Sequence, residues 1–220
     1  MEGITGALAD GTRDLGVTSR LIMCFLRDLS AKDAMTTLET ALPYRDDIIA
    51  VGLDSAEAGK PPAKFRDVFA RARSEGFLTV AHADEEGPAA YVRETLDELE
   101  VLRIDHGVRS MGDAAVVDRL GKEGMPLTVC PLSNIRLKVF ESMAAHPFKA
   151  MRDASLLVTV NSDDPAYFGS YPNDNYRALR DAFGFTDSEL ADPARNSFRA
   201  SFLDDEQKQT YLREVNTYVT

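Results

Sequence analysis

Six short runs of apolar residues recur along the chain and alternate with longer segments of helical periodicity. Short, continuous runs rich in valine, isoleucine and leucine are typical of strands that are buried on both faces of a parallel sheet. Between them, apolar residues at positions i, i+3, i+4 and i+7 indicate amphipathic helices, as in residues 65–72, which follow two prolines. The predicted strands are residues 20–26, 48–53, 77–81, 101–104, 126–130 and 156–160.

After the last predicted strand the pattern is helical only. We expect a short helix over residues 187–190, with Asp187 as its N-cap, and two further helices over residues 196–203 and 205–218. The alternation of strands and helices predicts right-handed crossover units and an α/β fold with a parallel sheet. Because the sequence has no linker or low-complexity run, we expect a single domain over residues 1–220.

Polar residues follow most of the predicted strands, and their distribution favours a barrel over an open doubly wound sheet. Barrel enzymes collect functional groups from many strand ends, whereas an open sheet concentrates its ligand contacts at one switch point. The sequence also lacks a glycine-rich phosphate loop. We therefore predict a (β/α)8 barrel of the TIM type that is incomplete, with about six of eight strands and extra C-terminal helices. The polar residues in question are Arg27, Asp28, Asp54, His82, Glu85, Asp105, His106, Ser133, Asn134, Asp163 and Asp164.

Composition narrows the class of ligand. The 25 Lys and Arg residues against 36 Asp and Glu residues give a net charge of −11, which disfavours nucleic acid or an anionic membrane as a partner. A small molecule is the expected ligand. The sequence contains neither an apolar run long enough for a membrane span nor a signal peptide at residues 1–16, so we expect a cytoplasmic protein. Cys24 and Cys130 are isolated in apolar runs, as expected of reduced core thiols.

The chain has three histidines, and two of them close consecutive predicted strands. His82 ends one strand and is followed by acidic residues; His106 ends the next and is followed by Gly107, which allows a ligand or backbone to approach closely. Either histidine alone is compatible with a surface position, but the repetition favours a functional site. His146 precedes Pro147 between two helical stretches, and we expect it to have a structural or surface role.

Two adjacent carboxylates, Asp163 and Asp164, follow the last predicted strand and precede Pro165. An N-cap at the start of a helix accounts for one of them. Because neighbouring carboxylates repel each other unless a cation is present, the pair also suggests a metal ligand beside a hydrogen-bond acceptor for a substrate. Imidazole together with carboxylate suits zinc or a similar divalent ion, and a catalytic zinc takes three protein ligands and a water.

The motifs HADEEG, RIDHGV, TVCPLSN and VNSDDPAYFG, in this order, resemble the successive strand-end motifs of the adenosine/adenine deaminase family. The segment VGLDSAEAGKPPAKF resembles the adenine deaminase branch in particular. The resemblance implies that His82 and Asp163 bind one Zn²⁺ per chain, and that Glu85 protonates purine N1 while an activated water attacks C6. It also implies that His106 holds that water and that Asp164 accepts a hydrogen bond from N7. Burial of Glu85 against a purine would favour the neutral acid that this role requires.

The sequence departs from the family pattern in two respects. The family carries two histidines separated by one residue on its first strand, and these complete the metal site; this chain has no such pair. The resemblance therefore implies that the N-terminal strands and half of the protein ligands are missing, which leaves open barrel edges that an oligomer would cover. Asp84 stands where the family usually has a glycine next to the catalytic glutamate, and a carboxylate there would alter the approach to the purine.

Three hypotheses about function follow from the sequence. The first is zinc-dependent deamination of adenine to hypoxanthine and ammonia, a purine-salvage reaction, with the chain as a truncated form that is either active or inactive. The second is a degenerate, non-catalytic relative that binds a purine through the remaining half-site or binds nothing. The third keeps the reaction but changes the substrate to adenosine or an N6-substituted adenine.

Overall fold

The computed structural model describes residues 1–219, which divide into two compact units. The first unit consists of Met1–Ala81 and Glu94–Leu102. The second consists of His82–Arg93 and the chain from Arg103 onward. The prediction of a single domain stays a prediction.

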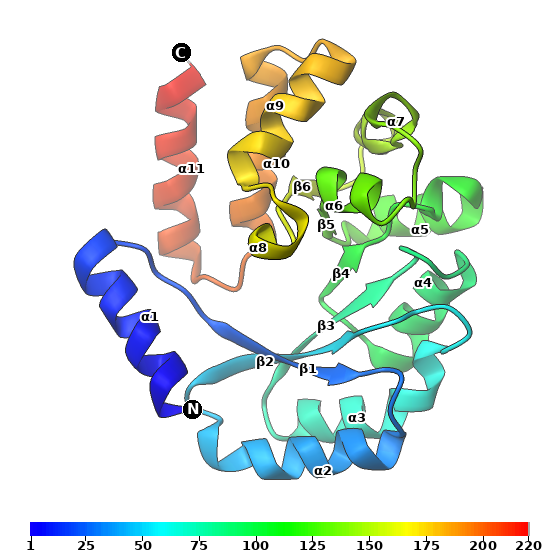
Figure 1. Ribbon diagram of the computed structural model, residues 1–220, viewed down its shortest axis with the longest axis vertical. Helices are drawn as coiled ribbons and strands as arrows, with labels where there is room; N and C mark the ends of the chain where they lie inside the picture. The colour runs from blue at the N-terminus through cyan, green and yellow to red at the C-terminus, as the bar shows by residue number, and fades with distance from the viewer. Residues whose placement is uncertain (220) are drawn as a thin grey trace. The chain divides into compact units, whose positions relative to one another are not determined.

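The first unit is built on parallel strands in chain order (Figure 1). Strand β1 (Leu21–Leu26) pairs with β2 (Ile48–Asp54), which pairs with β3 (Leu78–Ala83), and the last two residues of β3 belong to the second unit. Helices α1 (Glu2–Leu15), α2 (Ala31–Ala41) and α3 (Arg66–Ser74) complete this unit, together with the helical turn Thr95–Leu99. Helices α2 and α3 contact each other and lie on the same side of β1 and β2.

The core of the first unit forms where the helical and strand patterns place apolar side chains together. Val68, Phe69 and Ala72 of α3 are buried, as the periodicity of residues 65–72 predicts. The ring of Phe69 meets that of Phe25 from β1 edge to face, with centroids 5.8 Å apart. The side chain of Leu38 in α2 is also fully buried.

The second unit repeats the strand and helix alternation. Strands β4 (Arg103–His106), β5 (Leu127–Val129) and β6 (Val158–Val160) are parallel and follow chain order, with Ile104 opposite Leu127 and Leu127 opposite Val158. The helices are α4 (Ala90–Glu94, of which Glu94 belongs to the first unit), α5 (Ala114–Glu123), α6 (Pro131–Arg136), α7 (Phe148–Asp153), α8 (Pro165–Phe168), α9 (Pro172–Phe183), α10 (Asp187–Ala200) and α11 (Asp205–Val219). Helices α10 and α11 run side by side, and α10 also contacts β6.

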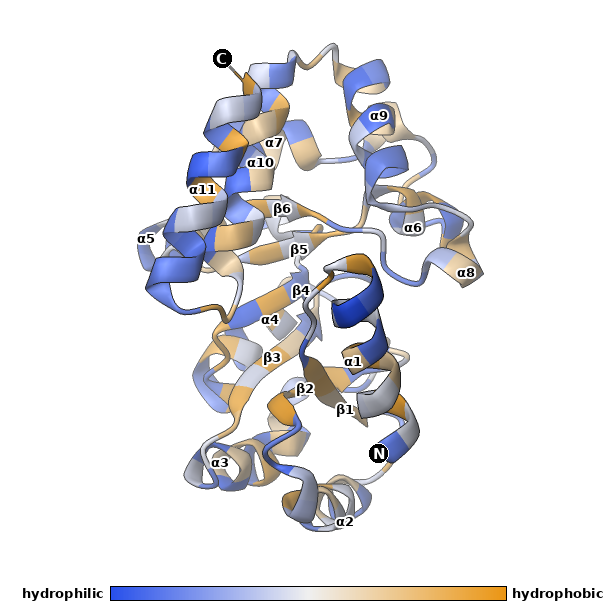
Figure 2. Ribbon diagram, turned by 90° about the vertical axis from the view of Figure 1, so that its left-hand side faces the viewer, coloured by the Kyte–Doolittle hydropathy of each residue, from blue (hydrophilic) through white to orange (hydrophobic). Residues whose placement is uncertain are grey.

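All the predicted strands are present, and their ends differ from the predicted ends by one to two residues in most cases. The difference that matters is in β3, which continues to Ala83, so that His82 lies inside the strand and not after it. Strand β6 begins at Val158 instead of residue 156. Figure 2 shows the apolar colouring concentrated on the strands, as expected for a buried sheet.

The prediction of two separate helices over residues 187–190 and 196–203 is wrong. A single helix, α10, runs from Asp187 to Ala200 through Pro193, and its N-cap is Thr186, not Asp187. A proline inside a helix removes one backbone hydrogen bond, which on its own disfavours continuation. Here the buried side chain of Pro193 packs inward, and Asn196 of the next turn donates a hydrogen bond to the Val158 carbonyl of β6, so tertiary contacts outweigh the local cost. The predicted final helix is confirmed as α11.

No helix within residues 1–219 combines the length and the apolar character that crossing a membrane requires.

Candidate functional site

The candidate site lies in the second unit, where β3 ends and where β4, β5 and β6 reach their carboxyl ends. His82 comes from β3, His106 is the last residue of β4, Cys130 follows β5, and Asp163 follows β6. All four line one cavity of about 370 Å³. This volume is within the range of about 300–1,000 Å³ that small-molecule sites occupy. The cavity is also lined by Arg103, Asp105, Thr128, Val160, Asn161, Ser162 and Pro172.

Each of the two histidines of the cavity has a carboxylate near its Nδ1. Nδ1 of His82 is 3.7 Å from Oδ2 of Asp105, and Nδ1 of His106 is 3.2 Å from Oε1 of Glu85. Their rings are neighbours, with centroids 4.9 Å apart. A carboxylate on one ring nitrogen fixes the ring and raises the basicity of the other nitrogen, which is the usual arrangement of histidines that bind metal ions.

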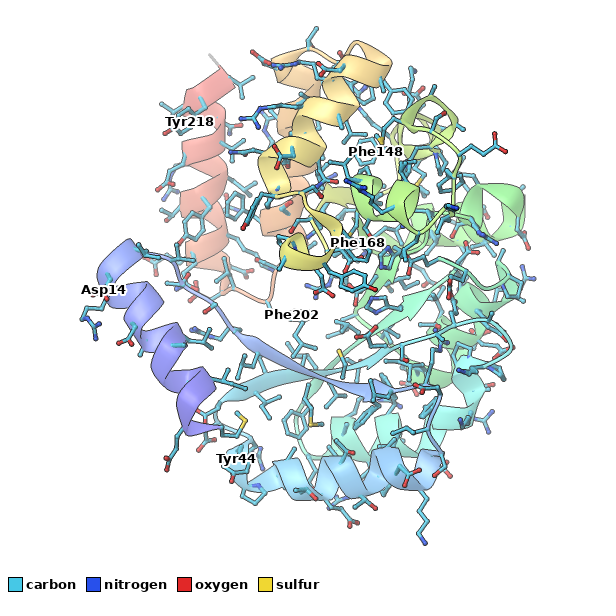
Figure 3. The ribbon with its side chains drawn as sticks, viewed as in Figure 1. Asp14, Tyr44, Phe148, Phe168, Phe202 and Tyr218 are labelled. Atoms are coloured by element: carbon cyan, nitrogen blue, oxygen red, sulfur yellow. The ribbon has the colours of Figure 1, made fainter. Side chains whose placement is uncertain are left out.

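The groups around Asp105 lower the pKa of its carboxyl group. Burial alone would raise its pKa, but the side chains of His82, Arg103 and His106, together with a hydrogen bond from Thr128, outweigh burial and lower the pKa below its usual value. The guanidinium group of Arg103 in turn lies 5.0 Å from the ring centroid of Phe202, which Figure 3 labels. Asp105 was predicted only as one of several polar residues at strand ends, and the structure places it directly beside His82.

Asp163 is held in place by hydrogen bonds on both carboxylate oxygens. The hydroxyl of Ser133 donates to Oδ2 at 2.6 Å, and the backbone N–H of Asp164 donates to Oδ1 at 3.0 Å. Nε2 of His106 lies 3.9 Å from Oδ2. Glu85, His106 and Asp163, which the sequence placed on three different strand ends, therefore form one continuous series of polar contacts.

The donor atoms best grouped for a metal ion belong to His106, Cys130 and Asp163, whose ligand atoms all lie within 4.8 Å of one another. Zinc bonds to sulfur and nitrogen at about 2.3 and 2.0 Å, so tetrahedral ligands lie about 3.5 Å apart and small side-chain movements would close this group. The predicted pair was His82 and Asp163, and His82 lines the same cavity. Imidazole, carboxylate and thiol are ligands that suit zinc, so the residues present fit this ion.

Cys130 is a buried free thiol, as predicted, but it also lines the cavity. Burial raises its pKa well above the usual value, and the carboxylates of Asp163, Asp105 and Glu85 add to this effect. The thiol donates weakly to the Thr128 carbonyl at 3.7 Å. The carboxylates that disfavour a thiolate would favour a cation in the same place.

Two residues that the sequence did not assign to the site are connected to Glu85, Asn134 directly and His146 through Asn134. The amide nitrogen of Asn134, a fully buried residue of α6, donates to Oε1 of Glu85 at 2.9 Å and lies 3.3 Å from Nδ1 of His106. The amide oxygen of Asn134 is 3.2 Å from Nε2 of His146. His146 was expected to be structural or exposed; it is buried and hydrogen-bonded one residue away from Glu85. The available signal was its position in the connection after β5, on the side of the strands where the other site residues lie.

Several site residues adopt backbone conformations that are uncommon for L-amino acids. Asp84, His106 and Asp163 have φ values of 66°, 66° and 60°. Such left-handed conformations cost free energy and cluster at functional sites. The conformation of Asp84 also gives a physical reason for the glycine that the family pattern has at this position. Its buried carboxylate accepts a hydrogen bond from Ser110 at 2.9 Å.

Asp164, the predicted acceptor for purine N7, is exposed at the start of α8. Its backbone carbonyl accepts hydrogen bonds from Tyr167 and Phe168, so it occupies the N-cap position that the alternative interpretation gave it. The position is compatible with both interpretations, and the role in substrate binding stays a prediction.

A family model described as adenosine deaminase matches residues 1–218. The chain belongs to the adenosine deaminase family. It is 56% identical over 216 residues to adenine deaminase of Acinetobacter baylyi, and this alignment covers 98% of the chain and 65% of the relative. The chain thus spans about two thirds of the length of the curated relative that it matches.

Two solved structures extend the comparison. Adenine deaminase from Arthrobacter aurescens is 48% identical, with a TM-score of 0.96 over 99% of this chain and 66% of that one. An amidohydrolase from Burkholderia ambifaria, crystallised with bound Zn, is 27% identical, with a TM-score of 0.90 over 97% of this chain and 61% of that one. The predicted family and fold class, an incomplete α/β barrel, are confirmed by these similarities.

Proposed function

We propose that this chain carries the acid and part of the metal site of an adenine deaminase, which hydrolyses adenine to hypoxanthine and ammonia. The observation that carries the proposal is the series of contacts from Glu85 through His106 to Asp163, of which His106 and Asp163 line a cavity of suitable size. Relatives that are more than half identical to the chain bear the name adenine deaminase, which supports the choice of substrate.

The residues take the roles that hydrolysis at a purine C6 requires. Addition of water at C6 breaks the aromaticity of the ring, so N1 must gain a proton as the new bond forms. Glu85 supplies that proton. His106, between Glu85 and Asp163, orients the attacking water, receives its proton and passes it to the amino group, which leaves C6 as ammonia. The new C6 hydroxyl returns a proton to Glu85 and becomes the carbonyl of hypoxanthine. Asp164 accepts a hydrogen bond from N7 and fixes the base in the cavity.

The metal ion would be one Zn²⁺ per chain, held by His82 and Asp163. A bound zinc ion supplies Lewis acidity that makes water a usable nucleophile near neutral pH. His82 is oriented for this role by Asp105 on its Nδ1, and Asp163 by Ser133. His106 and Cys130 are the further donors close to Asp163.

Metal analysis of the purified chain, combined with an ammonia-release assay on adenine, tests the proposal. We expect stoichiometric zinc and release of ammonia that falls by at least about a hundredfold in Glu85→Gln, because general acid catalysis is worth about 10²–10⁴ in rate. Glu86→Gln is the matched control: this neighbouring carboxylate is exposed, and its loss should leave turnover unchanged. Zinc-loaded chain that binds adenine without releasing ammonia would support the non-catalytic relative instead.

The same assay separates the substrates. Adenine, adenosine and an N6-methylated adenine are compared at equal concentrations, and we expect adenine to have the highest kcat/KM. A preference for adenosine or for the N6-substituted base would replace the substrate in the proposal but keep the reaction. We place the reaction in cytoplasmic purine salvage, with a free purine as the ligand.

A further inference from the structure

A buried chain of hydrogen bonds leads from the backbone of α7 to the carboxyl group of Glu85. The backbone N–H of Phe148, the first residue of α7 and labelled in Figure 3, donates to Nδ1 of His146 at 3.1 Å. Nε2 of His146 lies 3.2 Å from the amide oxygen of Asn134. The amide nitrogen of Asn134 donates to Oε1 of Glu85 at 2.9 Å. His146, Asn134 and Phe148 are each buried, with at most 3% of their surface exposed.

The backbone N–H of Phe148 fixes the direction of every hydrogen bond in this series. A backbone N–H can only donate, so Nδ1 of His146 must present a lone pair to Phe148. A neutral imidazole then carries its hydrogen on Nε2 and donates it to Asn134. The amide of Asn134 consequently turns its oxygen toward His146 and its nitrogen toward Glu85. Burial lowers the pKa of His146 to about 4, so the ring is neutral near pH 7.

We propose that His146 is a positioning residue for the general acid: through Asn134, it assigns the acidic proton of Glu85 to Oε2. The inference rests on the proposed function, in which Glu85 protonates the purine. Oε1 already accepts a hydrogen from Asn134, so a neutral Glu85 carries its own hydrogen on the other oxygen. If the Asn134 amide were flipped, its oxygen would face Glu85 and attract the proton to Oε1, away from N1 of the substrate.

A merely structural histidine would also be buried and hydrogen-bonded at this point. His146 lies beside the ring of Phe140, with centroids 5.0 Å apart, and it joins α7 to the preceding helical turn Met143–Ala145. The two roles differ in what the imidazole must do. A structural role needs the bond to Phe148 and the packing, whereas the positioning role also needs the hydrogen that Nε2 gives to Asn134.

Two substitutions separate these roles. In His146→Gln, the side-chain amide reaches as far as Nε2 and can still donate to Asn134; in His146→Asn, the shorter amide can accept from Phe148 but does not reach Asn134. We expect His146→Asn to lower kcat on adenine about tenfold, which corresponds to the loss of one buried hydrogen bond, with KM changed less than about twofold. We expect His146→Gln to restore kcat to within about twofold to threefold of the parent value.

Nuclear magnetic resonance gives a readout that does not depend on turnover. In the ¹⁵N-labelled chain, the ¹⁵N shifts of His146 should report the Nε2–H tautomer, and the side-chain amide of Asn134 should exchange slowly with solvent. That amide signal should move in His146→Asn and stay close to the parent position in His146→Gln. Thermal melting of all three proteins shows that each is folded at the measuring temperature.

The outcomes are separable from those of the proposed function. An Nδ1–H tautomer, an Asn134 signal that is the same in all three proteins, or equal kcat values in the two variants would each overturn the positioning role. If the parent chain releases no ammonia from adenine, the proposed function fails, and the tautomer and the Asn134 signal still decide whether His146 orients the amide that faces Glu85.

Discussion

Because His146 is buried and neutral, we predict that the chain loses stability in mildly acidic solution. A substitution of His146 should remove this part of the pH dependence. In the folded chain the pKa of His146 is lowered from 6.5 to about 4 by burial. The surroundings fit the neutral ring only, because protonation would place a hydrogen on Nδ1 facing the N–H of Phe148. The unfolded chain therefore binds a proton at this residue at higher pH than the folded chain does.

The sign and size of the effect follow from linkage. Where the unfolded state binds more protons, the free energy of unfolding rises with pH, so the contribution of His146 is complete above pH 6.5 and is lost as the pH falls toward 4. Each pH unit in this window is worth about 1.4 kcal/mol. Between pH 7 and pH 4.5 the loss from this group comes to about 2–3 kcal/mol, against a total of about 5–15 kcal/mol for typical domains.

The assay is urea unfolding of the parent chain and of His146→Gln, followed by circular dichroism at intervals of half a pH unit. Glutamine keeps a donor for Asn134 but does not titrate. Carboxylates shared by both proteins cancel in the difference between their unfolding free energies. We expect this difference to shift by about 2–3 kcal/mol against the parent chain between pH 7 and pH 4.5. A difference that stays constant with pH would refute the reasoning.

Three further predictions concern the metal site and the strained backbone around it. Cobalt(II) binds in place of zinc and gives a charge-transfer band when a thiolate is among its ligands. We expect this band when cobalt(II) is added to the chain, because the ligand atoms of Cys130 and Asp163 lie within 4.8 Å of each other. The band should vanish in Cys130→Ser and persist in Cys24→Ser; cobalt d–d bands without it would place Cys130 outside the coordination sphere. Ser133→Ala should weaken zinc binding about 10–100-fold in a chelator competition assay, because Asp163 loses the bond that orients it. Asp84→Gly should be more stable than Asp84→Ala by about 1 kcal/mol in urea unfolding, since both lose the same side chain and only alanine strains the left-handed backbone; equal stabilities would count against that strain.

The strands were predictable because burial on both faces leaves a continuous apolar run, which is a local property of the sequence. Their ends were less predictable. The apolar pattern does not indicate that β3 continues through His82, because a histidine near the end of a strand and a histidine just after the strand give the same sequence pattern. Helix α10 shows the opposite case, in which Pro193 is a strong local stop signal that packing against β6 overrides.

The site was predictable to the extent that its residues lie at the ends of predicted strands. His106 and Asp163 fall into this class, and the structure brings them to within 3.9 Å. The roles of Asn134, which also follows a predicted strand, and of His146, which does not, come from contacts with residues that are distant in sequence. Hydrophobic periodicity specifies which face of an element is buried, and it contains no information about which polar group meets which.

The hydrogen-bond chain behind Glu85 begins at a group that cannot titrate, and this determines how the acid can respond to pH. The N–H of Phe148 is a donor at every pH, so it selects one tautomer of His146 and, through it, one orientation of Asn134. A second carboxyl group or a charged histidine in the place of Asn134 would orient Glu85 equally well at one pH but would gain or lose its charge as it titrated. A neutral amide backed by a buried neutral ring holds the acid in one orientation over the whole range above the pKa of His146, which is about 4. The stability contributed by His146 is therefore lost between about pH 6.5 and pH 4, as the unfolded chain takes up the proton, whereas the orientation is lost only below about pH 4, where the folded ring itself is protonated.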